Sequence, residues 1–152
     1  MKKTLRIGLA LSICAVATMA FAQQKNPAVK ARQAQMDLFV FEAGYLGAMA
    51  QGKAPYDADA AQKAADSLVA LTQVDQSRYW VKGTDSDSIE GTRALPDIMA
   101  NPDDVTQHLA KLSEAAMAVQ KVAGTGQDAL GQAIGPVFAA CGGCHKAYRM
   151  PD

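Results

Sequence analysis

Residues 138–150, close to the end of the 152-residue chain, read FAACGGCHKAYRM. The chain has only three cysteines and two histidines, and Cys141, Cys144 and His145 lie within five consecutive positions. On a helix, two cysteines three residues apart and a histidine four residues after the first share one face. The motif therefore predicts a helix that presents two thiols and an imidazole together toward the interior of the protein.

The first 22 residues have the composition of a secretory signal peptide. Three basic residues precede an almost wholly apolar run over 7–20, and alanines at positions 20 and 22 suit a signal peptidase. The apolar run is shorter than the roughly 20 residues that a good membrane span needs. We therefore expect cleavage after Ala22 and export to the periplasm, with an uncleaved membrane anchor as the alternative.

Cleavage changes the composition of the chain. It removes three of the 15 basic residues and none of the 15 acidic ones, which leaves 130 residues with a formal charge of −3. A mildly acidic domain has no electrostatic reason to bind nucleic acid or anionic lipid, and we expect no membrane span after residue 22. Cys14 is also lost, so both remaining cysteines lie in the motif. Because about 130 residues can bury a core without disulfides, these cysteines need another explanation.

The remaining chain predicts four helices and no convincing strand, because alanine is frequent and alternating β-branched runs are absent. We expect helices over 27–51, 57–75, 101–122 and from 127 onward, with a long irregular segment over 76–100. We also expect Pro136 to kink or weaken the last helix. The apolar residues recur at helical spacing: Val29, Met36, Val40, Ala43, Leu46 and Ala50; Ala61, Ala64, Leu68, Leu71 and Val74; Val105, Leu109, Leu112, Ala116 and Val119; and Leu130, Ile134, Val137 and Tyr148. The predicted fold is an all-α, antiparallel four-helix bundle, and such bundles often hold a cofactor in the core.

The chemistry of the motif favours a covalently bound haem near the C-terminal helix. Two thiols add across the vinyl groups of a haem to form thioethers, and the adjacent imidazole ligates the iron, so Cys-x-x-Cys-His is the attachment signature of haem c. A thioredoxin-like pair needs a βαβ setting, and a structural zinc site needs four ligands. A disulfide would leave His145 unexplained. We also expect the two glycines between the cysteines to make room for the porphyrin edge.

The position of the motif constrains the other side of the haem. Only seven residues follow His145, too few to cover the opposite, distal face. We expect the distal residues to come from the helix over 27–51. The other histidine, His108, lies beside the apolar face of the 101–122 helix and is expected at the surface or rim.

With these features in place, the chain resembles the class II cytochromes c, which comprise cytochrome c′ and its low-spin relatives of the c-556 type. The resemblance covers essentially the whole chain after residue 22. It rests on Arg32-Gln33-x-x-Met36, on GKAPYD over 52–57, on TRALPDI over 92–98 and on CGGCHKAYR, which ends at Arg149. One departure is Met99, where the family often has tryptophan, and it affects local packing rather than haem attachment.

The resemblance implies roles for several residues beyond the motif. Those implied to contact the haem propionates or edge are Arg32, Gln33, Thr92 and Arg93. Arg149 is implied on the proximal side, where it can tune the ligand, although a basic residue is equally at home at a helix C-terminus. For the arginines chemistry agrees, because guanidinium pairs well with carboxylate. The alternative for each polar residue is a solvated surface position.

Met36 lies where the family places its distal residue, and it decides between two mechanisms. Its thioether can be the sixth iron ligand, which gives a low-spin electron carrier of the c-556 type. Alternatively it packs as an apolar side chain and leaves the iron five-coordinate, as in a cytochrome c′ that binds nitric oxide or carbon monoxide. We favour the second interpretation, because Phe39, Val40 and Phe41 predict a tight, dry distal side.

The pattern does not favour an enzyme. A haem peroxidase needs a polar distal base, and the 27–51 helix offers Met36 among phenylalanines. The expected partners are an unidentified redox protein and a diatomic gas. The resemblance also implies homodimers through the first two helices, where Ala43, Gly44 and Gly47 permit close packing.

Overall fold

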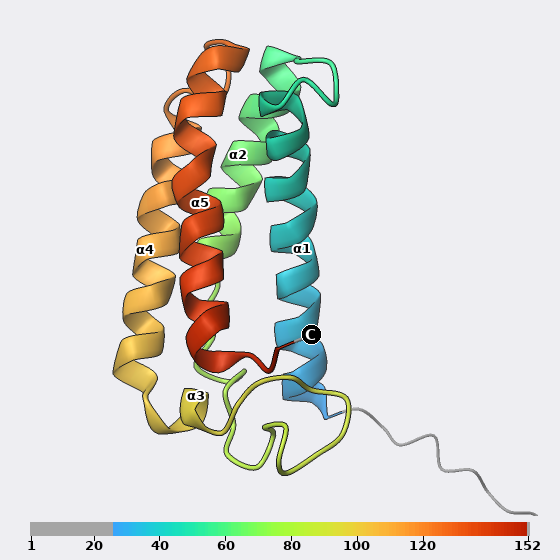
Figure 1. Ribbon diagram of the computed structural model, residues 1–152, viewed down its shortest axis with the longest axis vertical. Coiled ribbons are helices and arrows are strands. Elements are labelled where there is room, and N and C mark those ends of the chain that lie inside the picture. The colour runs from blue at the N-terminus through green and yellow to red at the C-terminus, as the bar shows by residue number, and fades with distance from the viewer. Residues whose placement is uncertain (1–25, 152) are drawn as a thin grey trace, which may run out of the picture.

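The computed structural model describes residues 26–151, so the segment assigned to a signal peptide, 1–22, lies outside the described residues. The helices are α1 (Pro27–Ala50), α2 (Ala58–Thr72), α3 (Asp97–Ala100), α4 (Pro102–Gln120) and α5 (Gln127–Tyr148). Four long helices stand side by side as an antiparallel bundle, and the segment between α2 and α3 wraps one end of it (Figure 1). The predicted four-helix bundle is confirmed.

The ends of the first two long helices follow local sequence chemistry. The Asn26 side chain accepts a hydrogen bond from the backbone N–H of Ala28 at 2.9 Å, and Pro27 occupies the first turn of α1. Asp57 caps α2 by accepting from the N–H of Ala60 at 2.7 Å. These caps satisfy backbone N–H groups that have no partner inside the helix. After α1 the chain turns at Gly52, whose φ of +67° favours glycine.

Two predicted boundaries are wrong. α2 ends at Thr72 instead of 75, so Val74 lies outside the helix and is exposed. The reason is local: the carboxylate of Asp75 accepts hydrogen bonds from the backbone N–H and the hydroxyl of Ser77, which favours a turn over a further helical turn. The segment over 76–100 is also not wholly irregular, because its last four residues form α3.

Pro136 does not interrupt the C-terminal helix. α5 is one helix from Gln127 to Tyr148, with Pro136 in its interior. A proline removes one helical hydrogen bond to the carbonyl four residues earlier, here that of Gln132. Both residues are exposed, so water can serve that carbonyl. Because Pro136 lies on the outer face of α5, it lowers the stability of the helix less than the sequence alone predicts.

The interior consists of two apolar groups. The core cluster runs along the bundle, where α1 packs on α2 and α5 and α4 packs on the same two helices. Its buried members include Phe39, Leu46, Leu68 and Leu130, and many of the others are alanines. The second cluster, at the end near α3, consists of Ile98, Val105 and Tyr148. Small side chains in the core cluster allow the helices to approach closely.

None of the helices within residues 26–151 has the length and apolar character needed to cross a membrane.

Candidate functional site

The motif lies in the last two turns of α5, and Cys141, Cys144 and His145 are all half-buried. Cys141 packs against the core cluster, as does Met36 of α1. Cys144 packs against the second cluster, as does Trp80 from the segment after α2. In Figure 1, this end of α5 shares one end of the bundle with the start of α1 and with α3. The motif therefore lies where the two apolar clusters meet.

Both thiols are held in the protonated form. They are not joined in a disulfide. Burial raises the pKa of Cys141, and burial together with the nearby Cys141 and Asp104 raises the pKa of Cys144. A dithiol redox centre needs a lowered thiol pKa, because the thiolate is the nucleophile. The environment of the pair does not fit a thioredoxin-like function.

His145 has the opposite perturbation. Burial, followed by the positive charges of Arg149 and Arg93, lowers the pKa of this imidazole. A neutral imidazole has a free nitrogen lone pair, which is the form that binds a metal. The resemblance had placed these two arginines near the haem, and in the structure the positive charge of each acts on the predicted axial ligand, His145.

The glycines between the two cysteines do not face the bundle interior. Both are exposed. A Cβ atom at Gly142 would meet nothing within 4 Å, while one at Gly143 would lie 3.8 Å from Cε1 of His108 on α4. The prediction that these glycines make room for the porphyrin edge has no support in this geometry, because the cysteines and His145 take the inward positions of the turn.

The residues expected on the distal side differ in their exposure. Phe39 is buried, and Met36 is half-buried against the core cluster. Val40 and Phe41, in contrast, are 71% and 70% exposed. Successive helical residues are about 100° apart, so three in a row do not line one pocket. The three residues therefore do not all share one face of α1, and a tight, dry distal side formed by them stays a prediction.

Arg32 is the best-anchored polar residue of α1, at 3% exposure. Its Nη1 donates to the carbonyl of Tyr79 at 3.0 Å and to Oγ1 of Thr84 at 2.8 Å. Its Nη2 donates to the carbonyl of Thr84 and to Oγ1 of Thr92, the latter at 2.7 Å. The resemblance implied that Arg32 and Thr92 both contact the haem; in the structure they contact each other, and both terminal nitrogens of Arg32 donate to protein acceptors.

The remaining predicted contact residues fasten the same end of the bundle. The side-chain amide of Gln33 donates to the carbonyl of Gly91 at 2.8 Å. Arg93 donates through its guanidinium to the carbonyl of Met150 at 2.6 Å, and the Met150 N–H donates back to the carbonyl of Arg93 at 2.9 Å. Next to this pair, Ala94 forms an isolated antiparallel bridge with Arg149. The 91–94 segment is thus attached to α1 and to the residues after α5.

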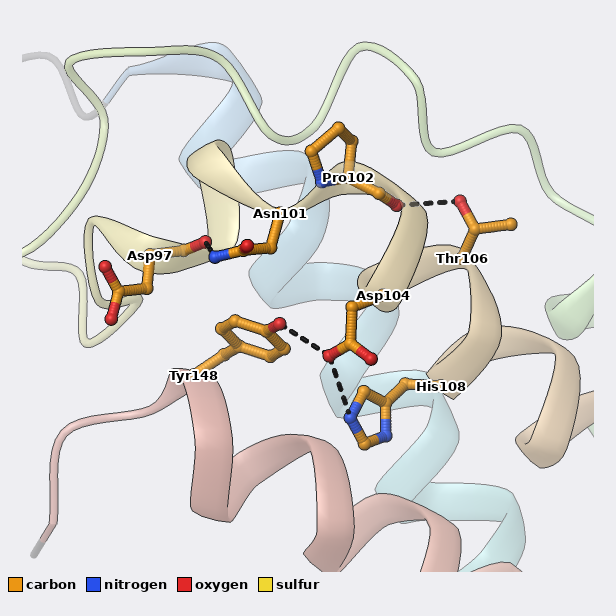
Figure 2. A network of polar contacts seen from close by, with 7 residues as sticks. All are labelled: Asp97, Asn101, Pro102, Asp104, Thr106, His108 and Tyr148. Carbon is orange, nitrogen blue, oxygen red and sulfur yellow. Dashed lines mark hydrogen bonds and ion pairs between the residues drawn. The ribbon is translucent and has the colours of Figure 1, made fainter.

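Sequence reasoning missed a polar network beside the motif (Figure 2). The hydroxyl of Tyr148 donates to Oδ2 of Asp104 at 2.6 Å, and Nε2 of His108 lies 3.5 Å from the same oxygen. The rings of His108 and Tyr148 meet edge to face with centroids 6.0 Å apart. His108 was expected at the surface or rim, and its side chain is 17% exposed in the groove between α4 and α5. The spacing of Asp104 and His108, four apart on a helix, was the available signal.

Comparison with known proteins places the chain in a family. Residues 27–149 match the family described as Cytochrome C'. A cytochrome c-554 of Cereibacter sphaeroides is 40% identical over 147 residues, covering 95% of this chain and 96% of that protein. A cytochrome c' of the same organism is 37% identical over 145 residues, covering 95% and 97%. The solved cytochrome c' from Rhodobacter Spheriodes superposes with a TM-score of 0.79 at 38% identity, over 82% of this chain and 96% of that one.

This chain belongs to the cytochrome c′ family, a family of non-enzymatic haem proteins in the class II cytochromes c. Membership implies a covalent haem c.

The residues present fit such a group. The donor set, two protonated thiols and a neutral imidazole on one helical face, is the one that haem c requires. Three buried polar atoms within residues 26–151 also have no hydrogen-bond partner: Oε1 of Gln35, Oε1 of Gln76 and Nε1 of Trp80. Unpaired buried polar atoms are rare and need an explanation. Of the three, Trp80 packs on the same cluster as Cys144, so its unpaired N–H lies at the end of the bundle that carries the motif.

Proposed function

We propose that this chain is a periplasmic c-type haem protein that carries single electrons and binds a small diatomic gas, either nitric oxide or carbon monoxide. In this proposal Cys141 and Cys144 form the two thioethers, His145 is the proximal axial ligand, and Met36 lies on the distal side. The observation that carries it is the placement of Cys141, Cys144 and His145, all half-buried, on one face of α5. Met36 of α1 packs against the core cluster, as Cys141 does.

The residues around the motif have distinct roles in this proposal. The haem, when bound, supplies a one-electron iron couple and an axial position for a gas. The lowered pKa of His145 keeps its nitrogen available for iron. The hydrogen bonds of Arg32 and Gln33 hold the 79–92 segment against α1. We infer that Arg32 acts mainly by shaping this wall, since a propionate would have to displace protein acceptors from both its terminal nitrogens.

The gas-binding part of the proposal rests on two supports. A cytochrome c' variant from Alcaligenes xylosoxidans was solved with carbon monoxide bound, and another, in the ferrous state, with nitric oxide bound. In this chain, Met36 packs against the core cluster. Its unbranched, flexible side chain can fill an apolar space and can also move aside for a small ligand.

The second candidate is a six-coordinate, low-spin electron carrier with Met36 as the sixth ligand. Relatives of this chain include cytochromes c-554 and c-556 as well as c'. A methionine thioether is a sufficient axial ligand and raises the reduction potential.

The test that separates the two candidates is the visible spectrum of the purified protein, oxidised and reduced, with and without carbon monoxide. We expect a high-spin spectrum that changes when the gas is added. A low-spin spectrum that ignores the gas would instead establish the Met36-ligated carrier. Absence of any covalent haem band would overturn both candidates.

We further propose that the protein forms a homodimer through the outer face of α1. Leu38, Phe41 and Tyr45 recur at steps of three and four and are all exposed, and large exposed apolar groups often mark an interface. One cytochrome c' with similar architecture has a ligand-controlled dimer dissociation. Sedimentation of the wild type should give a dimer, and Phe41→Glu should give a monomer with an unchanged haem spectrum. A monomeric wild type at high micromolar concentration would refute the interface.

Export remains part of the proposal and has its own check. Cleavage after Ala22 would leave Gln23 as the first residue of the haem-loaded protein. Intact-mass analysis of the periplasmic fraction should give the mass of residues 23–152 plus one haem.

A further inference from the structure

The polar network formed by Tyr148, Asp104 and His108, hereafter the α4–α5 network, lies beside the haem motif (Figure 2). Tyr148 follows His145 by one turn of α5, and its ring is buried in the second cluster, on which Cys144 also packs. The ring of His108 lies across from the backbone of Gly143, between the two motif cysteines. The network is therefore held at a fixed position next to the proposed haem attachment site.

The network places one fixed and one variable charge at this position. Asp104 accepts a hydrogen bond from Tyr148 and lies next to His108, and an imidazole can be either neutral or protonated. When His108 is protonated, the pair is neutral overall. When His108 is neutral, the pair carries the negative charge of Asp104. Asp104 is also close enough to the motif to affect Cys144, whose pKa is raised first by burial, then by Cys141 and then by Asp104.

We propose that His108 and Asp104 couple haem reduction to proton uptake, with His108 binding its proton more tightly in the reduced protein than in the oxidised protein. A one-electron donor adds one negative charge next to the network. One proton from solvent then goes to an imidazole nitrogen of His108 in those molecules in which His108 was neutral. The electron and the proton together leave the local charge unchanged. This inference rests on the covalent haem and the electron-transfer role proposed above.

Several other charged or titratable groups lie around His108. On α4, Lys111 and Glu114 line the same groove as His108. From α5, Tyr148 faces the ring, and its pKa is raised to about 12, chiefly by the hydrogen bond to Asp104. In the haem-loaded protein the sulfur of Cys144 forms a thioether. Asp97 on α3 also raises the pKa of Tyr148, but less than Asp104 does. The chain has only one other histidine, His145, which is the proposed iron ligand.

The test is a spectroelectrochemical titration of the haem-loaded protein between pH 5 and 8.5. We expect the reduction potential of the wild type to fall as the pH rises, because neutral His108 leaves Asp104 uncompensated. The limiting slope for one proton per electron is about 59 mV per pH unit, and partial coupling gives less. In His108→Gln the slope should disappear. A flat wild-type profile overturns the proposal without any variant.

Two further variants locate the effect. Asp104→Asn should move the sloping region to lower pH, because His108 loses the carboxylate that favours its protonated form; an unmoved region would remove Asp104 from the coupling. Lys111→Gln is the matched control, one turn along α4 in the same groove, and should keep the wild-type slope. If the slope persists in His108→Gln, it belongs to the haem carboxylates and the proposal fails. A protein that purifies without covalent haem would instead show failure of the proposed function.

Discussion

The guanidinium carbon of Arg32 lies 5.4 Å from the centre of the Trp80 ring, in the geometry of a cation–π contact. Trp80 belongs to the segment after α2, and Arg32 lies near the start of α1. Together with the four hydrogen bonds to Tyr79, Thr84 and Thr92, this contact makes Arg32 the residue that attaches the 79–92 segment to the bundle. The position of the 79–92 segment at the motif end of the bundle therefore depends on the buried guanidinium of Arg32.

Arg32→Met should destabilise the protein by about 2–4 kcal/mol, since two backbone carbonyls and two hydroxyls would lose a charged donor. Urea unfolding of the haem-loaded protein measures this change. Lys30→Met, two residues earlier at an exposed position, is the matched control and should change stability by less than about 0.5 kcal/mol. Equal effects of the two substitutions would show that Arg32 does not hold the segment.

Two glycines of α1 should respond differently to alanine. A Cβ at Gly44 meets nothing within 4 Å, so Gly44→Ala should raise the free energy of unfolding by about 0.5–1 kcal/mol through helix propensity. A Cβ at Gly47 would lie 2.9 Å from Cζ of Phe138, so the ring must move and the gain should be smaller or absent. Denaturant midpoints of the two variants test the difference. Identical gains would mean that Phe138 does not pack on Gly47.

Alkaline pH should destabilise the protein through Tyr148. Its pKa is raised to about 12 in the folded state, first by the hydrogen bond to Asp104, against about 10 when unfolded. The folded state therefore holds a proton that the unfolded state loses between these values. This contribution to stability is complete below pH 10 and is lost as the pH rises toward 12.

The measurement is the unfolding free energy at pH 9, 10 and 11 for the wild type and for Tyr148→Phe. The wild type should lose more stability over this range than the variant. Tyr45→Phe, at an exposed position of α1, serves as the control and should follow the wild type. Parallel declines for all three proteins would exclude a special role of Tyr148.

The substitution Met36→Ala tests whether Met36 only packs on the distal side or ligates the iron. If Met36 only packs on the distal side, the variant should stay high-spin and bind carbon monoxide faster, which stopped-flow absorbance measures. If Met36 ligates iron, the variant should change from low-spin to high-spin and its reduction potential should fall. No change in either property would remove Met36 from the distal site.

Covalent attachment depends on both motif cysteines. The double variant Cys141→Ala, Cys144→Ala should yield a chain from which acid–acetone extracts all haem. Cys14→Ala is the control, since Cys14 lies in the segment expected to be cleaved, and its haem should resist extraction. Haem that stays bound to the double variant would disprove the thioether assignment.

Much of the architecture was predictable because helix formation depends on residues that are close together in the sequence. Alternating steps of four and three among Val105, Leu109, Leu112, Ala116 and Val119 specify an apolar face whatever the partner helix is. The same local logic placed Cys141, Cys144 and His145 on one side of α5. Predictions failed where a residue's spacing in the chain was a poor guide, as for Val74, which continues the apolar pattern of α2 yet lies beyond its end and is exposed.

The sequence by itself determined the number of long helices, the haem motif and its face, because backbone hydrogen bonding and side-chain periodicity act over a few residues. Only the tertiary structure decided which polar groups meet. Arg32 donates hydrogen bonds to Thr84 and Thr92, which are 52 and 60 residues away in the sequence. Tyr148 donates one to Asp104, which is 44 residues away. The physical reason is that such pairs form only after helix packing has excluded water around them, so their partners depend on the fold and not on spacing in the sequence.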